Sequence, residues 1–340
     1  MLLVFRKSLE CRRMSMVRHL LVITSFMLFS GWSLAGEVPA GLWSSAEGSS
    51  YYPPYVFTVD KSKRKLSVWD TNTVPFKKIK EFENDQGKVD GNKMVQGDNK
   101  TPEGIYFFQE QKNGHDVNYE RYGERIFTMD YPNLFDKRIG KTGYGIWLHA
   151  VPDTTPLSRG SEGCVVLRNE NILNVSENIV LGRTPILIYD EMNLVSEKDR
   201  KKEVQRINKF LNAWQTAWQS KDLDTYMSYY ANDFKAMRMD KDTWRRYKKG
   251  LNEKYDVVQV NLSQPFVFEQ NGNIIVRALQ HYRSDKHEDY GEKFLYVRRT
   301  PVGGFEIIHE SWESVPREVV TRELGTETIS GRELSSVPVN

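Results

Sequence analysis

One histidine and one cysteine in the middle of the chain could act together as a base and a nucleophile. His149 follows the apolar run 146–148, and Cys164 opens a second apolar run, 164–167, after a loop rich in Pro, Ser and Gly. If the two runs are neighbouring strands, both side chains lie at the same edge of a sheet. A histidine beside a thiol can take its proton and later return it to a leaving amine. The pair therefore predicts covalent attack by sulfur on an acyl group.

The residues around the cysteine agree with this chemistry. Gly163 permits a tight turn directly before the nucleophile. The backbone N–H groups of Gly163 and Cys164 could then face the oxyanion that develops during the attack. The alternative is a buried cysteine beside a buried histidine, with no catalytic role.

The N-terminus, residues 1–35, has the pattern of a secretory signal. Arg12, Arg13 and Arg18 precede the mostly apolar run 20–34, and small residues around position 35 predict cleavage before Gly36. An uncleaved membrane anchor is the alternative. The chain has 2 cysteines, and cleavage removes Cys11. A lone thiol in an oxidising compartment is a liability, which favours a function for Cys164.

Charge and histidine spacing exclude two classes of function. The formal net charge is +3. Residues 1–35 hold five basic residues and one acidic residue, so the mature chain has 43 basic and 44 acidic residues, a net charge of −1. Without a basic stripe, nucleic-acid binding has little support. No histidines have ligand spacing joined to carboxylates or a second cysteine, so we expect neither a metal nor another cofactor.

The pattern of apolar residues predicts two domains. Strand-like runs dominate up to residue 169, at 55–60, 65–70, 104–109, 126–130, 146–150, 164–167 and 185–189, with one short helix over 170–178. Helical spacing follows over 197–230 and 242–254, and alternating runs then extend from 257 to 312. We therefore expect a linker at 36–52, a mostly-β domain at 53–191, an α+β domain at 196–317 and a loose tail at 318–340.

The segment around the His–Cys pair resembles the YkuD-type L,D-transpeptidase domain. His149, Ser161, Gly163 and Cys164 match that family's pattern, and the segments 101–106, 130–133 and 140–143 resemble its outlying motifs. The resemblance covers about 53–191. It implies a cysteine enzyme that acts on the stem peptides of peptidoglycan, and for an exported chain it implies the periplasm.

Three positions depart from the family pattern, and they bear on the reaction. Ala150 stands where Gly usually follows the histidine, Glu162 where a second His is usual, and Val166 where Arg is usual. The resemblance assigns the orientation of His149 to a backbone carbonyl, that of Ala150. With these departures and a C-terminal α+β domain, the chain resembles the cell-shape L,D-carboxypeptidases, which trim tetrapeptide stems. The alternative reaction is transpeptidation, which forms 3–3 cross-links or attaches a protein to the wall.

Other assignments concern substrate and partners. Arg159 is expected to contact a substrate carboxylate, and Ser161, Glu162 and Tyr131 are assigned to substrate binding. The second domain resembles the NTF2-like fold through residues 217–234. Such a domain could hold a ligand or form a homodimer, and an inactive wall-binding module is the alternative from another class of protein.

Overall fold

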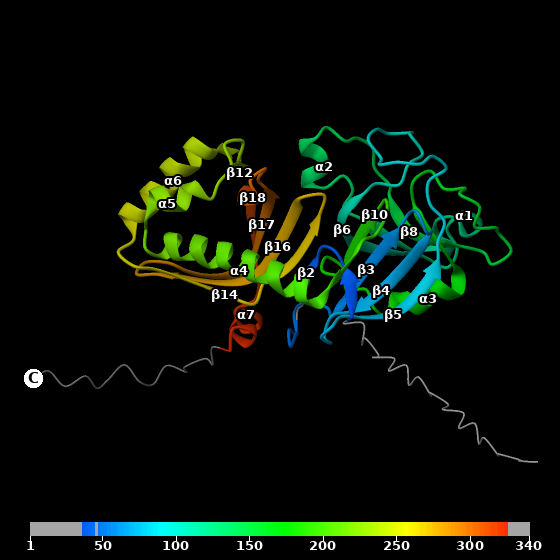
Figure 1. The fold of residues 1–340 in the computed structure, drawn as a ribbon, viewed down its shortest axis with the longest axis horizontal. Helices are drawn as coiled ribbons and strands as arrows, with labels where there is room; N and C mark the ends of the chain where they lie inside the picture. The colour runs from blue at the N-terminus through cyan, green and yellow to red at the C-terminus, as the bar shows by residue number, and fades with distance from the viewer. Residues whose placement is uncertain (1–35, 45–46, 326–340) are drawn as a thin grey trace, which may run out of the picture. The chain divides into compact units, whose positions relative to one another are not determined.

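The first half of the chain folds around one mixed β-sheet (Figure 1). The computed structural model describes residues 36–44 and 47–325, and within these ranges the sheet has eight strands. Their order is β5-β4-β3-β10-β6-β7-β8-β9. The bounds are β3 Tyr55–Asp60, β4 Lys65–Asp70, β5 Lys77–Glu83, β6 Gly104–Asn113, β7 Arg125–Met129, β8 Trp147–Val151, β9 Val165–Arg168 and β10 Pro185–Tyr189. The seven strand-like runs of the sequence all fall on these strands, and β5 is added at the edge.

The centre of this sheet is formed by continuous apolar runs. β10 pairs parallel with β3 and antiparallel with β6. All five residues of β10 are buried, as expected for a strand that is covered on both faces. Phe57, Ile186 and Ile188 are fully buried, and each side chain of this kind stabilises the fold by about 1.5–3 kcal/mol.

Short helices join the strands. They are the 3-10 helix η1 Gly114–Asp116, α1 Tyr119–Tyr122, α2 Leu134–Arg138 and α3 Asn169–Ser176. Asn118 begins α1 by accepting a hydrogen bond from the Arg121 N–H, and Asn133 begins α2 in a capping box with Asp136. Only α3 overlaps the short helix that the sequence predicted at 170–178.

The second half of the chain has a second sheet and three main helices. In the part of the chain that the structure describes, six strands form this sheet, ordered β18-β17-β16-β15-β2 with β14 paired to β16. The strands are β2 Leu42–Ser44, β14 Val258–Leu262, β15 Phe266–Gln270, β16 Asn273–Ser284, β17 Glu288–Arg299 and β18 Phe305–Ser314. The helices are α4 Glu197–Gln219, α5 Leu223–Ser228 and α6 Lys241–Lys254, with a small hairpin of β12 Lys235–Ala236 and β13 Met239–Asp240 before α6. This is the predicted α+β domain.

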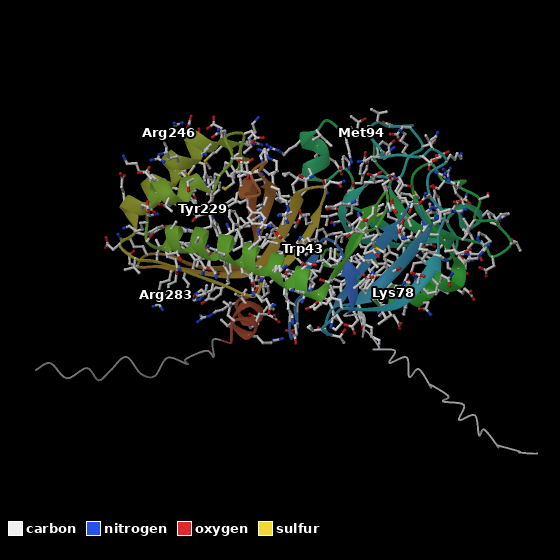
Figure 2. All side chains as sticks on the ribbon, viewed as in Figure 1. Trp43, Lys78, Met94, Tyr229, Arg246 and Arg283 are labelled. Atoms are coloured by element: carbon white, nitrogen blue, oxygen red, sulfur yellow. The ribbon has the colours of Figure 1, made fainter. Side chains whose placement is uncertain are left out.

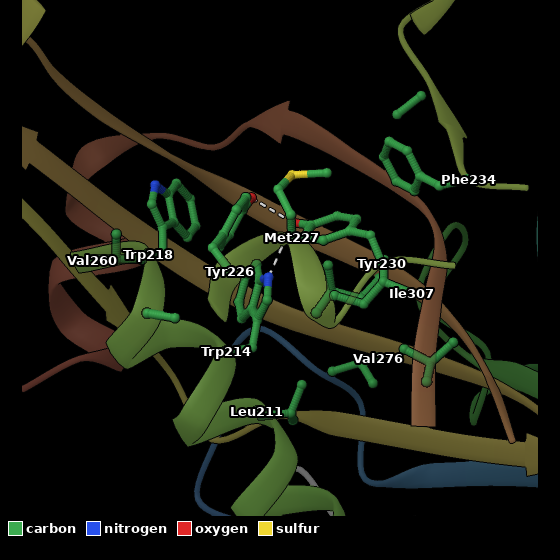
Figure 3. Packing of buried hydrophobic residues seen from close by; sticks show 14 of the residues in the cluster. Leu211, Trp214, Trp218, Tyr226, Met227, Tyr230, Phe234, Val260, Val276 and Ile307 are labelled. Atoms are coloured by element: carbon green, nitrogen blue, oxygen red, sulfur yellow. Dashed lines mark hydrogen bonds between the residues drawn. The ribbon is translucent and has the colours of Figure 1, made fainter. Parts of the chain in front are cut away.

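Aromatic side chains fill the space between these helices and the sheet (Figure 3). Trp214 of α4 is fully buried and donates a hydrogen bond from Nε1 to the Tyr230 hydroxyl over 3.0 Å. The Tyr230 hydroxyl in turn donates to Glu310 over 2.6 Å. These three buried polar groups are thus paired with one another, as a buried network requires. Charged side chains such as Lys78, Arg246 and Arg283 are exposed (Figure 2).

The segment before the first domain contributes strands to the second half of the chain. β1 Glu37–Pro39 pairs with β11 Leu194–Ser196, and β2 pairs with β15. Both strands lie inside the stretch 36–52 that was expected to be a linker. At the other end, α7 Arg317–Glu323 is a short helix at the start of the expected tail, and its Val320 is fully buried.

Candidate active site

Two neighbouring parallel strands position the histidine and the cysteine. β8 and β9 pair in parallel, with His149 opposite Val166 and Leu148 opposite Val165. Side chains alternate between the faces of a strand, so Cys164, two residues before Val166, is on the same face as His149. Both side chains line one cleft with a volume of about 650 Å³. The structure therefore brings together the two residues that the sequence selected.

His149 is held in one orientation by the backbone. It is 5% exposed, and its Nδ1 lies 2.7 Å from the carbonyl oxygen of Ala150. A carbonyl only accepts, so Nδ1 carries the proton and Nε2 is left with a lone pair. The Tyr122 ring meets the imidazole edge-on, with 5.1 Å between the centroids. Burial lowers the pKa of His149 to about 4, so the imidazole is neutral at pH 7 and can act as a base.

Cys164 is a protonated thiol in this arrangement. Its Sγ donates a hydrogen bond to the carbonyl oxygen of Gly145 over 3.5 Å. Burial raises the pKa of Cys164 to about 11. With the low pKa of His149, this means that the resting pair at neutral pH is a neutral thiol and a neutral imidazole. Proton transfer to His149 therefore belongs to the attack on the substrate and does not precede it.

Ser161 and Gly163 shape the loop before the nucleophile. The Ser161 Oγ donates to the Cys164 carbonyl oxygen over 2.7 Å and accepts from the Gly163 N–H over 3.0 Å. Gly163 has φ +132°, and a Cβ there would lie 2.6 Å from the Lys100 carbonyl oxygen. Only glycine fits this position. Its N–H is engaged by Ser161, so the predicted oxyanion role of Gly163 requires that bond to open, whereas that of the Cys164 N–H stays a prediction.

A buried carboxylate anchors the rest of this loop. Asp85 is 4% exposed and accepts hydrogen bonds from the N–H groups of Gly160 and Arg159, the former over 2.8 Å. Arg64 contacts the same carboxylate over 3.2 Å. Asp85 follows β5, at one end of the strand order, and the nucleophile loop precedes β9, at the other end. These hydrogen bonds therefore join the loop to the segment after β5.

Two of the predicted substrate-binding residues do not line the cleft. Arg159 has φ +60° and directs its guanidinium to Asp90, at 2.5 Å, and to the carbonyl oxygen of Gly87. Tyr131 is 5% exposed in the core of the first domain and donates its hydroxyl to the Thr142 carbonyl oxygen over 3.1 Å. In this geometry both side chains bind other parts of the protein and not the cleft. Ser161 and Glu162 do line the cleft.

The cleft also contains residues that the sequence analysis did not select. Helix α1 packs beside β8 (Figure 1) and brings Arg121 and Tyr122 to the mouth of the cleft. Arg121 pairs with Glu162, with 3.0 Å between Nη2 and Oε2. Tyr144 and Trp147 add aromatic walls. The local sequence of α1, four residues long, carries no periodic pattern that could have revealed this helix.

Two kinds of feature were not found in the described part of the chain. Among the described residues, no group of three or more His, Cys, Asp or Glu side chains is placed to hold a metal ion. Within 36–44 and 47–325, no helix is long and apolar enough to cross a membrane.

Comparison with known families accounts for both halves of the chain. Residues 54–188 match the YkuD L,D-transpeptidase catalytic domain, and residues 206–311 match the Cds6 C-terminal NTF2-like domain. A chain with this catalytic domain is an enzyme of the L,D-transpeptidase type. The predicted fold class of both domains is thereby confirmed.

Solved structures carry the same pair of domains. The structure of Bd1075 from Bdellovibrio bacteriovorus is 42% identical, with a TM-score of 0.76, and the match covers 83% of this chain and 100% of that one. The helical cell shape determining protein Pgp2 from Campylobacter jejuni is 23% identical, with a TM-score of 0.63 over 82% of this chain and 94% of that one. The Pgp2 likeness shows the fold alone. No match was found among curated protein sequences.

This chain belongs to the YkuD family of L,D-transpeptidase proteins, in the group that carries a C-terminal Cds6-type NTF2-like domain.

Proposed function

We propose that this protein is an exported L,D-carboxypeptidase that removes the terminal D-Ala from tetrapeptide stems of peptidoglycan. The observation that carries the proposal is the cleft in which Cys164 lies on the same face as His149, whose Nδ1 is fixed by the Ala150 carbonyl 2.7 Å away. This arrangement leaves Nε2 as the base for a thiol in a cleft large enough for a peptide. We place the enzyme in the periplasm on the basis of the signal pattern in residues 1–35.

The reaction has two halves. In the first, the Cys164 proton moves to His149 Nε2 while Sγ attacks the carbonyl carbon before the terminal D-Ala. The C–N bond breaks, and the leaving amine takes the proton from His149, which leaves a thioester. In the second half, His149 takes a proton from water as the water oxygen attacks the thioester. The C–S bond then breaks, the proton returns to sulfur, and the tripeptide acid is released.

The surroundings of the thiol favour water as the acceptor. Transpeptidation requires an amine to be held in line with the thioester. The carboxylate nearest the nucleophile in sequence is Glu162, and it is paired with Arg121 at 3.0 Å. While that pair is closed, Glu162 does not hold an incoming ammonium group. Water needs no such site, so hydrolysis is the expected outcome.

The test is a time course with purified protein and disaccharide tetrapeptide, with products resolved by mass. Release of D-Ala and formation of tripeptide are expected, and Cys164→Ala is the control. Cross-linked dimer in excess over tripeptide would make the enzyme a transpeptidase. No product in either form would leave a wall-binding module. A ligand or a second copy held by the NTF2-like domain stays a prediction that this experiment does not address.

A further inference from the structure

The cleft presents one accessible cation among the described residues that line it. Two basic side chains line the cleft, Arg121 and Lys93. The Lys93 side chain is 4% exposed, and its Nζ is bound to Asp98 over 2.8 Å and to the Val95 carbonyl oxygen over 3.1 Å. It is therefore a structural ion. The Arg121 side chain is 57% exposed, so its guanidinium can meet a ligand.

Arg121 contacts residues that neighbour both reacting groups. Its Nη2 is 3.0 Å from the carboxylate of Glu162, which is two residues before the nucleophile. Its guanidinium carbon is 5.4 Å from the centre of the Tyr122 ring, and that ring contacts His149. Burial is the main cause of the shifted pKa of both Cys164 and His149, and the positive charge of Arg121 lowers each pKa.

The pair between Arg121 and Glu162 leaves room for a second anion. A guanidinium carries five N–H donors in a planar fork, and a single short contact to Glu162 is present. Both side chains are more than half exposed, at 57% and 61%. An exposed pair of this kind contributes little net free energy. A carboxylate that enters the cleft can add to the free edge of the fork while the contact with Glu162 stays in place.

We propose that Arg121 binds the free carboxylate at the C-terminus of the substrate peptide and so makes the enzyme selective for removal of a terminal residue. This inference rests on the proposed function. In the residue that leaves, the carboxylate is separated from the scissile carbonyl carbon by the amide nitrogen and one Cα, so it lies within a few bonds of Cys164 Sγ in the attacking complex. Arg121 takes the role that the sequence analysis gave to Arg159, which is bound to Asp90.

The inference predicts a difference between two ligands that differ in one group. The probes are a stem tetrapeptide that ends in D-Ala as the free acid and the same peptide as the C-terminal amide. Binding is measured calorimetrically to full-length mature protein carrying Cys164→Ala, which cannot turn the peptides over. A charge-assisted hydrogen bond predicts that the acid binds about 10- to 100-fold more tightly than the amide.

Three variants in the Cys164→Ala background locate this preference. Arg121→Met is expected to bind both peptides within about threefold of each other, because the charge-assisted contact is gone. Arg121→Lys retains the charge without the fork and should keep part of the preference; it also decides the matter if Arg121→Met does not fold. Arg283→Met removes an exposed arginine of the second domain and should change neither affinity (Figure 2). Equal affinity for acid and amide before any change at Arg121, binding of neither peptide, or an unchanged preference in Arg121→Met would each overturn the inference.

Turnover by the unmodified enzyme separates this inference from the proposed function. If no stem peptide is hydrolysed while the Cys164→Ala protein still prefers the acid through Arg121, the proposed function fails and the inference stands. If acid and amide are hydrolysed with equal kcat/KM, the inference fails and the proposed function stands. A preference for the acid that Arg121→Met abolishes through KM supports both.

Discussion

Cys164 is expected to react slowly with alkylating agents at neutral pH, because it is protonated at rest. Burial raises its pKa to about 11, whereas a free cysteine has a pKa of about 8.5. At pH 7 this leaves about one thiolate in 10⁴ molecules, against about three in 100 for a free thiol. Since the thiolate is the reactive form, alkylation of Cys164 should be about 300-fold slower than that of a free cysteine.

The assay follows iodoacetamide adduct formation by mass between pH 6 and 10. In protein expressed from Gly36 onward, which lacks Cys11, Cys164 is the sole thiol, so each adduct reports this site. The logarithm of the rate should rise by about one per pH unit across the whole range. N-acetylcysteine is the control, and its rate should level off above its own pKa. A plateau for Cys164 between pH 6 and 8 would refute the reasoning, because it would require a preformed thiolate–imidazolium pair.

The remaining predictions concern catalysis and stability. Cys164→Ala should lower turnover by about 10³-fold or more with the fold retained, as judged by circular dichroism. Gly163→Ala should destabilise the protein by about 1–3 kcal/mol in urea titration, because φ is +132° and the new Cβ would meet the Lys100 carbonyl oxygen at 2.6 Å. Burial lowers the pKa of His149 to about 4 in the folded state. The stability that depends on a neutral His149 is therefore fully present above about pH 6.5 and is lost as the pH falls to about 4. Over this window the free energy of unfolding of the wild type should fall by about 3 kcal/mol more than that of His149→Gln. Asp85→Ala leaves the N–H groups of Arg159 and Gly160 without their acceptor and should lower kcat by about 10- to 100-fold; because the carboxylate is buried and also contacts Arg64, the melting temperature should fall as well.

The elements that the sequence predicted are those whose apolar pattern is strong. β10 is an unbroken apolar run, and α4 repeats apolar residues at helical spacing over 23 residues. β5 was missed because its residues, KKIKEFE, are mostly exposed at the edge of the sheet. α1 and α2 were missed because helices of four and five residues depend on their asparagine caps and not on periodicity. β2 was missed because three residues in a small, polar stretch form a strand only when β15 is beside them.

The candidate site was predictable where its residues lie close in the sequence. His149 and Cys164 end and begin adjacent apolar runs, and the parallel pairing of β8 and β9 turns that spacing into proximity. The place of Arg121 in the cleft was not predictable from the sequence. Its helix α1 lies beside β8 only because β7, the strand after α1, pairs with β8. Arg159 is near the nucleophile in sequence, but nearness does not set direction: its positive φ and the charge of Asp90 turn its side chain elsewhere.

The pairing of β2 with β15 has a consequence for how this protein is made and divided. Ser44 and Val267 are register partners, but the whole first domain lies between them in the sequence and is synthesised before Val267. β2 must therefore wait in an unpaired state through most of synthesis. A fragment cut at residue 196 would leave β15 with an open edge, and open edges recruit other chains into aggregates. We expect the second domain to be soluble on its own only when the segment 37–44 is supplied, either as a peptide or by fusion.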